Sequence, residues 1–401
     1  MTGTAVPTAR GSVGEVFLVF LRLGLTSFGG PIAHLGYFRE EFVVRRRWLD
    51  DHAYADLVAL CQFLPGPASS QVAIAVGLGR AGYPGAAASW LGFTMPSAIA
   101  LVLFAFGAAS LVDALGGGWL QGLKTVAVAI VAQAIWGMAR ALTPDLKRAA
   151  VAVLALCVCI AVPSAWGQVG AIALGAAIGA IALSGSTTTA GRIPVEVGHG
   201  VAVACLVLFF LLLVGLPLVA GADGAITLFD KFYRAGALVF GGGHVVLPLL
   251  QAEVVGPGWV DKETFIAGYG AAQAVPGPLF TFAAYLGASM KVWPSGLLGA
   301  AVALVAIFAP CVLLVVGALP FWASLAARPG LRAALAGINA AVVGLLGAAF
   351  YDPVWTAGVP SGFHFALAVA AFVALEMGKV PAWLVVVVAA LVGAGIPMLA
   401  R

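Results

Sequence analysis

Two arginines stand inside long apolar runs, and each precedes a pair of glycines by the same spacing. Arg22 lies in FLRLGLTSFGG and Arg234 in FYRAGALVFGG, and the two segments share Phe, Arg, Gly, Phe, Gly and Gly at a constant offset of 212 residues. An arginine at membrane depth is costly and needs a partner or a function. A planar guanidinium group binds oxyanions through two parallel hydrogen bonds. The pair therefore indicates an anion site, with snorkelling to the interface or a structural ion pair as the alternative.

The chain also interrupts an apolar segment twice with Pro-Gly-Pro, in QFLPGPASSQ at 62–71 and in QAVPGPLFT at 273–281. Proline is tolerated in the first turn of a helix, and a helix N-terminus offers free N–H groups and partial positive charge to an anion. A proline kink that only shapes packing is the alternative. The candidate substrate-binding residues are Arg22, Gly29, Gly30, Gln62, Pro65, Gly66, Pro67, Ser69, Ser70, Gln71, Arg234, Gly241, Gly242, Gly243, Gln273, Pro276, Gly277, Pro278 and Thr281.

Four ionisable residues accompany these motifs. Glu41 and Glu253 coincide in the two segments, whereas His34 and His244 follow the glycines two residues out of register. All four are candidates for proton coupling, since histidine titrates near physiological pH. Solvated carboxylates beside polar loops and hydrogen-bonded histidines at helix ends are the alternatives. The five cysteines lack metal-ligand spacing and no nucleotide-phosphate loop is present, so we expect no metal and no cofactor.

Composition fixes the class of protein to which these motifs belong. Of the 401 residues, 62% are hydrophobic and 9% are charged, against about 25% charged in soluble domains. The chain is therefore expected to be an all-α, polytopic integral membrane protein with about 10 to 13 hydrophobic segments. The net charge of +4 is too small to indicate a nucleic-acid-binding surface. The expected surroundings are the lipid bilayer, and a homodimer is compatible with the sequence.

The similarity between the two segments extends along the chain. After a one-residue deletion, Trp48 matches Trp259 and Gln62 matches Gln273, and the two Pro-Gly-Pro motifs coincide. The chain therefore consists of two homologous repeats, at 1–190 and 191–401, joined near the Ser-, Thr- and Gly-rich stretch 184–200. Interrupted segments at corresponding positions of two halves indicate the binding site of a transporter. Broken helices are tolerated in a membrane only where protein or a water-filled cavity satisfies the backbone.

The motifs together resemble the chromate ion transporter family in its two-domain form. The resemblance rests on SFGGPIAH, RRRWLDD and QFLPGPASSQVAIAVG in the first half and on VFGGGH, GWVDKETF and QAVPGPLFTFAAYLG in the second. It implies a multi-pass protein of the cell membrane that exports chromate, confers chromate resistance and treats sulfate as a related oxyanion. It also implies halves of opposite membrane orientation.

Charge and segment counts test that orientation separately. The first-half loop carries Arg39 and Arg45–Arg47, whereas its counterpart at 251–263 carries only Lys262. Since basic loops stay in the cytoplasm, this asymmetry favours an inverted repeat. Seven apolar segments separate the two loops if 53–80 crosses once, which agrees with inversion. If 53–80 is a re-entrant hairpin the count is six, which does not.

Two other functions are open from the residues alone. A transporter or channel for sulfate or another anion would need the same motifs, because chromate and sulfate share charge and shape. A membrane-embedded enzyme acting on lipid phosphates would need a cluster such as His/Asp or Ser/His. The histidines are scattered and no HExxH or GxSxG motif occurs, so we expect a transporter and not an enzyme.

Overall fold

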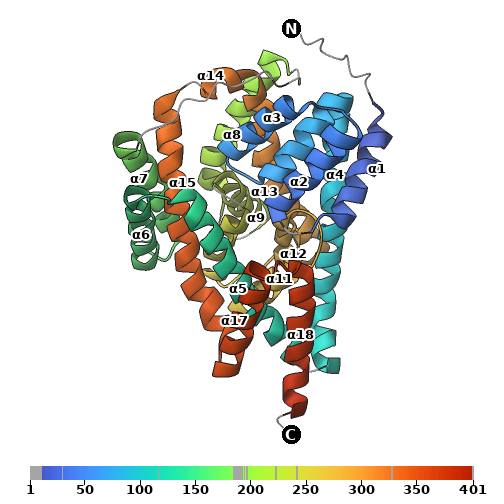
Figure 1. Ribbon diagram of the computed structural model, residues 1–401, viewed down its shortest axis with the longest axis vertical. Coiled ribbons are helices and arrows are strands. Elements are labelled where there is room, and N and C mark those ends of the chain that lie inside the picture. Colours follow the sequence, from blue (N-terminus) through green and yellow to red (C-terminus); the bar gives the residue numbers. More distant parts are fainter. Residues whose placement is uncertain are drawn as a thin grey trace.

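The computed structural model describes residues 11–28, 30–115, 117–183, 193, 195, 197–221, 224–240, 243–326 and 328–399. Three candidate site residues, Gly29, Gly241 and Gly242, lie outside the described residues. The described regular elements are all helical, which confirms the predicted fold class (Figure 1). The first half contains α1 (Val13–Thr26), α2 (Gly30–Arg39), α3 (Asp51–Phe63), α4 (Ala68–Leu115), α5 (Gly118–Leu142), α6 (Leu146–Ala161) and α7 (Ala165–Ala182). The remaining helices are α8 (His199–Val219), α9 (Ala225–Ala237), α10 (Val246–Leu250), α11 (Lys262–Ala272), α12 (Phe282–Ala288), α13 (Gly296–Ala318), α14 (Trp322–Ala326), α15 (Pro329–Ala349), α16 (Thr356–Gly358), α17 (Gly362–Glu376) and α18 (Ala382–Leu399).

The first glycine motif forms the tip of a helical hairpin. Ser12 caps α1 by accepting a hydrogen bond from the Glu15 N–H, and α1 ends 14 residues later. The chain then returns through α2 and a π-helix at Glu40–Arg45. Arg46 pairs with Glu15 at 3.3 Å, so the two arms begin and end at the same face. Neither arm alone has the about 20 residues needed to cross a bilayer.

Pro-Gly-Pro forms the tip of a second hairpin beside the first. α3 has 13 residues, and α4 leaves helical geometry at Ala81 and Gly82, which makes 68–80 a separate short helix. Gly77 packs against the Gly85 carbonyl, so the chain reverses there. The Gly11 N–H donates to the Arg80 carbonyl at 3.0 Å, which returns this hairpin to the face where α1 begins.

The second half repeats both hairpins. α9 leads to the glycine motif, and the chain returns through α10 and a π-helix at Gln251–Val255. α11 and α12 then flank the second Pro-Gly-Pro. Lys231 pairs with Glu253 at 3.0 Å, and the Lys291 N–H donates to the Trp259 carbonyl at 3.0 Å, so these hairpins also start and end at one face.

The long helices that follow the hairpins run in opposite directions. α4 leads from the end of the molecule that holds α1, α2 and α3 towards the other end, whereas α13 leads back to α14 beside α3 (Figure 1). The rings of Phe63 and Trp322 lie 5.7 Å apart and join α3 to α14. The two halves are therefore an inverted repeat with re-entrant helices, as predicted.

The conflict between the segment counts has a structural cause. The segment 53–80 is a hairpin and does not cross. The segment 226–250 is also a hairpin, although both segment counts in the sequence treated it as one crossing. The helices between the two loops are then α4, α5, α6, α7 and α8. α6 runs parallel to α15, because Ala152 faces Gly344 and Leu156 faces Gly347. α7 runs antiparallel to α15, because Gly175 faces Gly337 and Gly179 faces Ala333. The number of crossings is odd with or without this pair, which agrees with inversion.

Five of the described helices are long and apolar enough to cross a membrane: Ala68–Gly107, Gly118–Leu142, His199–Val219, Gly296–Phe321 and Pro329–Gly358. The other apolar helices are shorter, and several belong to the hairpins. The protein is a multi-pass membrane protein whose central helices are interrupted.

Opposite faces for the two loops give a direct topology test. Single cysteines at Arg47→Cys and Pro257→Cys, in a background with the five native cysteines replaced by serine, should react with impermeant maleimide from opposite sides of the membrane. Both positions are exposed, so each thiol is accessible. Labelling of both cysteines from one side would contradict the inverted arrangement. The unsubstituted cysteine-free protein controls for background labelling.

Candidate functional site

Each Pro-Gly-Pro tip is hydrogen-bonded to the glycine motif of the other half. The Gly66 N–H donates to the Val239 carbonyl at 2.7 Å, and the Gly277 N–H donates to the Ser27 carbonyl at 2.9 Å. Ser27 and Val239 are equivalent positions of the repeat, 212 residues apart. The two bonds are therefore reciprocal, and they bring all four chain breaks together. We call the described residues 27, 28, 30, 31, 65–67, 239, 240, 243 and 276–278 the central crossing.

Glycine is required at both tips for conformational and steric reasons. Gly66 has φ +118° and Gly277 has φ +98°, in the region that favours glycine. A Cβ on Gly277 would lie 2.9 Å from Ser97 Oγ. A Cβ on Gly66 would lie 3.0 Å from Gln71 Nε2 and would be in ordinary contact with Cys311 Cβ at 3.7 Å. Each tip thus packs against the long helix of the opposite half, just after the proline of that helix, Pro96 or Pro310.

Side chains in the first turn after each tip form hydrogen bonds that stabilise the interruption of the helix. Ser69, Ser70 and Gln71 are buried at the start of α4. The Gln71 side-chain amide donates to the Pro65 carbonyl at 2.8 Å. In the second half the Thr281 hydroxyl donates to the Pro278 carbonyl at 2.8 Å. The structure therefore places these candidate residues at the central crossing, where Gln71 and Thr281 hold the shape of the tips.

The matched amides Gln62 and Gln273 have different surroundings. Gln62 is exposed near the end of α3, whereas Gln273 is half-buried and its Nε2 atom has no hydrogen-bond partner. Gly30 has φ +77°, as a tight turn into α2 requires, and a Cβ on Gly243 would lie 3.1 Å from Pro31 Cγ. Gly243 of the second half therefore lies beside Pro31 of the first.

Both candidate histidines make specific hydrogen bonds. The buried His34 has Nε2 3.1 Å from the Ser27 carbonyl and Nδ1 3.4 Å from the Ser69 hydroxyl. His34 thereby links the first glycine motif to the first turn of α4. His244 Nδ1 lies 2.7 Å from the Tyr269 hydroxyl. Each ring is tied to one half of the protein.

Several buried polar atoms have no hydrogen-bond partner, although such groups are rarely left unpaired in proteins. Five of these atoms are Ser27 Oγ, Ser70 Oγ, Gln71 Oε1, Thr94 Oγ1 and Gln273 Nε2, and the Trp90 Nε1 atom of α4 is another. The hydroxyls and the amide nitrogen are hydrogen-bond donors that a ligand can use. Sequence analysis missed Ser27 and Thr94. The available signal was that Ser27 immediately precedes the glycine motif and that Thr94 stands two residues before Pro96.

The equivalent arginines have diverged. Arg234 pairs with Asp230 at 3.0 Å and with Glu253 at 3.4 Å, and Lys231 also binds Glu253 at 3.0 Å. Both carboxylates are buried. Two positive and two negative groups thus form a neutral cluster, so the Arg234 charge is already compensated.

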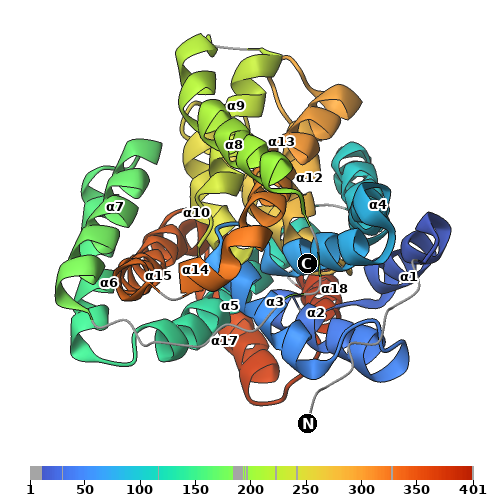
Figure 2. The same ribbon diagram turned by 90° about the horizontal axis from the view of Figure 1, so that it is seen from above.

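Arg22 is exposed on α1, and α1 lies at the rim of the molecule when it is seen from above (Figure 2). Among the described residues it forms no ion pair, because the equivalent of Asp230 is Leu18. The equivalent of Glu253 is Glu41, which binds Arg45 at 2.6 Å and Arg46 at 2.7 Å. The arginine at this position is therefore uncompensated in one half and neutralised in the other.

The chemistry available at the central crossing suits reversible anion binding. Hydroxyls, an amide and backbone N–H groups supply hydrogen bonds that an anion can form and release. Within the described ranges, no three His, Cys, Asp or Glu side chains gather as metal ligands.

Comparison with known proteins decides the family. The family model described as "Chromate transporter" matches residues 14–182 and 226–394, one region in each half. The chain belongs to the chromate transporter family. The two matched regions start 212 residues apart, at the offset of the internal repeat, which confirms the homologous halves. This chromate transporter homologue is accordingly a transporter and not an enzyme.

Named relatives extend over most of the chain. The chromate transport protein of Pseudomonas aeruginosa is 28% identical over 359 residues, covering 88% of this chain and 83% of the relative. The probable chromate transport protein of Synechococcus elongatus is 28% identical and covers 84% of each chain. The chromate transport protein of Cupriavidus metallidurans is 28% identical, covering 83% and 80%. No solved structure matches this transporter.

Proposed function

We propose that the protein exports chromate from the cytoplasm across the cell membrane, with the dianion bound at the central crossing between the two halves. The observation that carries the proposal is the reciprocal pair of hydrogen bonds from Gly66 and Gly277, beside buried donors that have no partner. An anion that binds there loses hydrogen bonds to water and gains hydrogen bonds from hydroxyl and N–H groups, which limits the free-energy cost of its desolvation.

Alternating access follows from the inverted repeat. Each half contributes hairpins that start and end at one face and have their tips in the centre, so movement of one pair of hairpins opens the site to one face. In the arrangement described here the two tip N–H groups are bonded to carbonyls of the opposite half. We propose that the anion competes with these carbonyls for the N–H groups, so that binding and opening are coupled.

The driving force requires no nucleotide. Moving two negative charges outward through 100 mV is worth about 4.6 kcal/mol, at about 2.3 kcal/mol per charge. Export is therefore downhill in a cell with a negative interior. His34, His244, Glu41 and Glu253 are the candidates for any additional proton coupling. Of these, the two carboxylates are engaged in ion pairs.

Substrate preference is tested by competition. Purified protein should bind radiolabelled chromate, and unlabelled chromate should displace it at lower concentration than sulfate. The basis for this order is the similarity of the chain to chromate transport proteins. Displacement by sulfate at a lower concentration than chromate would reassign the protein as a sulfate transporter. Binding of neither dianion would contradict an oxyanion function.

A further inference from the structure

The two ends of the central crossing share a backbone arrangement but differ in side-chain chemistry. At one end, Gly277 meets Ser27 and Ser97. At the other end, Gly66 meets Val239 and Cys311. Ser27 and Val239 are equivalent by the repeat, and Ser97 and Cys311 each follow the proline of a long helix. We call the first end the polar crossing and the second the apolar crossing.

Hydroxyl-bearing residues stand at the polar crossing and on the adjoining turn of α4, where Thr94 lies three residues before Ser97. Ser27 and Thr94 are fully buried, and neither hydroxyl has a hydrogen-bond partner. Ser97 Oγ donates to the Thr94 carbonyl at 3.1 Å and lies 2.9 Å from the position of a Cβ on Gly277. Unpaired buried hydroxyls lower stability, and a ligand that accepts their hydrogen bonds removes that cost.

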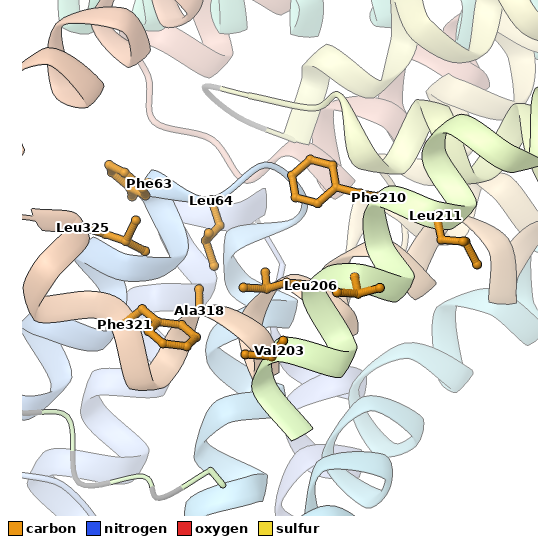
Figure 3. A pocket seen from close by; sticks show the side chains of 10 residues that line it. Phe63, Leu64, Val203, Leu206, Phe210, Leu211, Ala318, Phe321 and Leu325 are labelled. Atoms are coloured by element: carbon orange, nitrogen blue, oxygen red, sulfur yellow. The ribbon is translucent and has the colours of Figure 1, made fainter. Parts of the chain in front are cut away.

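The side chains of the opposite half that meet Gly66 at the apolar crossing offer an anion little. Valine has no polar side-chain atom, and a thiol is a weak donor. Leu64, immediately before this tip, lines an apolar cavity of about 800 Å³ together with Phe63, Leu206, Phe210 and Phe321 (Figure 3). A dianion moved into that cavity would lose its hydration without receiving replacement donors from the residues that line it.

We infer that the chain has one oxyanion site rather than two symmetric ones, and that Ser27, Thr94 and Ser97 bind the oxyanion there beside the N–H group of Gly277. The ligand class is the tetrahedral dianion, with chromate as the substrate; this inference rests on the proposed function. The first half therefore supplies the side-chain ligands, and the second half supplies the tip. The Ser27 carbonyl and the anion compete for the Gly277 N–H.

The repeat provides matched controls for the experiment. Chromate binding is measured by isothermal titration calorimetry on purified Ser27→Ala, Thr94→Val and Ser97→Ala, alongside Cys311→Ala and Cys311→Val at the apolar crossing. Each hydroxyl deletion should weaken binding by about tenfold or more, the effect of losing a hydrogen bond to a charged group. The apolar-crossing variants should stay within about twofold of the unsubstituted protein, at one anion per chain. Removal of the unpaired hydroxyls at Ser27 and Thr94 should leave the melting temperature unchanged or higher.

The outcomes separate this inference from the function on which it rests. Equal losses of chromate affinity in the variants of both crossings, or a stoichiometry of two anions per chain, would overturn the single-site inference. The proposed function would still stand in that case, because the unsubstituted protein binds chromate. Unchanged affinity in all three hydroxyl variants would also overturn it. An unsubstituted protein that does not bind chromate at all would overturn the proposed function and this inference together.

Discussion

Replacing Gly277 with leucine should reduce chromate flux at least 100-fold in protein that still inserts into the membrane. The residue has φ +98°, and its Cβ position lies 2.9 Å from Ser97 Oγ and 3.2 Å from the Phe93 carbonyl. A leucine must push the tip away from α4 and break the hydrogen bond to Ser27. Gly66→Leu should act in the same way, since its Cβ position lies 3.0 Å from Gln71 Nε2. Flux is measured per folded molecule in proteoliposomes.

A matched control separates crowding at the tips from backbone strain. Gly258 has φ +78°, and nothing lies within 4 Å of its Cβ position. Gly258→Leu therefore introduces comparable strain on the surface, of about 1–2 kcal/mol, and should transport normally. Normal flux in both Gly66→Leu and Gly277→Leu would exclude the tips from the transport path.

Arg234→Ala should destabilise the folded protein, whereas Arg22→Ala should not. Removing Arg234 leaves the buried Asp230 and Glu253 with only Lys231 to compensate them. Loss of one partner from a buried ion pair costs about 3–5 kcal/mol. The double variant Asp230→Ala/Arg234→Ala keeps the Lys231–Glu253 pair and should recover most of that loss. Thermal unfolding of detergent-solubilised protein measures both effects. A double variant as unstable as the single one would contradict this account of the cluster.

Arg22→Ala is the matched test of anion binding by arginine. The side chain is exposed and uncompensated among the described residues, so the variant should fold like the unsubstituted protein. If Arg22 contacts the oxyanion, affinity falls by about 10- to 150-fold, and Arg22→Lys loses less because it keeps the charge. Unchanged affinity in Arg22→Ala would leave the tips and hydroxyls as the whole anion site.

The breaks in the helices were predictable because they depend on local chemistry. Pro65 and Pro276 cannot continue a helix interior, and Gly66 and Gly277 occupy backbone regions that few other residues adopt. Their recurrence at a nearly fixed offset also revealed the two halves. The positive charges at Arg45–Arg47 also indicated the inversion, because the charge of a short loop influences the side of the membrane on which it lies.

The contacts between the halves could not be predicted in this way. An internal repeat identifies Ser27 with Val239, but it does not say that Ser27 meets Gly277. That contact depends on how two inverted halves pack. The hydroxyl of Thr94 likewise stands in an apolar helix with no motif around it.

The divergence of the two arginines was readable from their neighbours, though not from the arginines themselves. Asp230 stands four residues before Arg234, the spacing of a helical ion pair, whereas Leu18 stands four residues before Arg22. Glu41 has Arg45 and Arg46 close in sequence, and Glu253 has Pro257 and Gly258 instead. Comparing equivalent neighbourhoods, rather than equivalent residues, distinguishes the structural arginine from the free one.

Voltage-driven chromate flux in proteoliposomes tests the central claim most directly. With an imposed potential that is negative inside, trapped chromate should leave vesicles that contain the protein much faster than it leaves empty vesicles. The efflux should slow when the potential is collapsed, and vesicles with Gly277→Leu should behave like empty ones. Efflux from protein-containing vesicles at the rate of empty vesicles, under every imposed potential and pH gradient, would contradict chromate export through the central crossing.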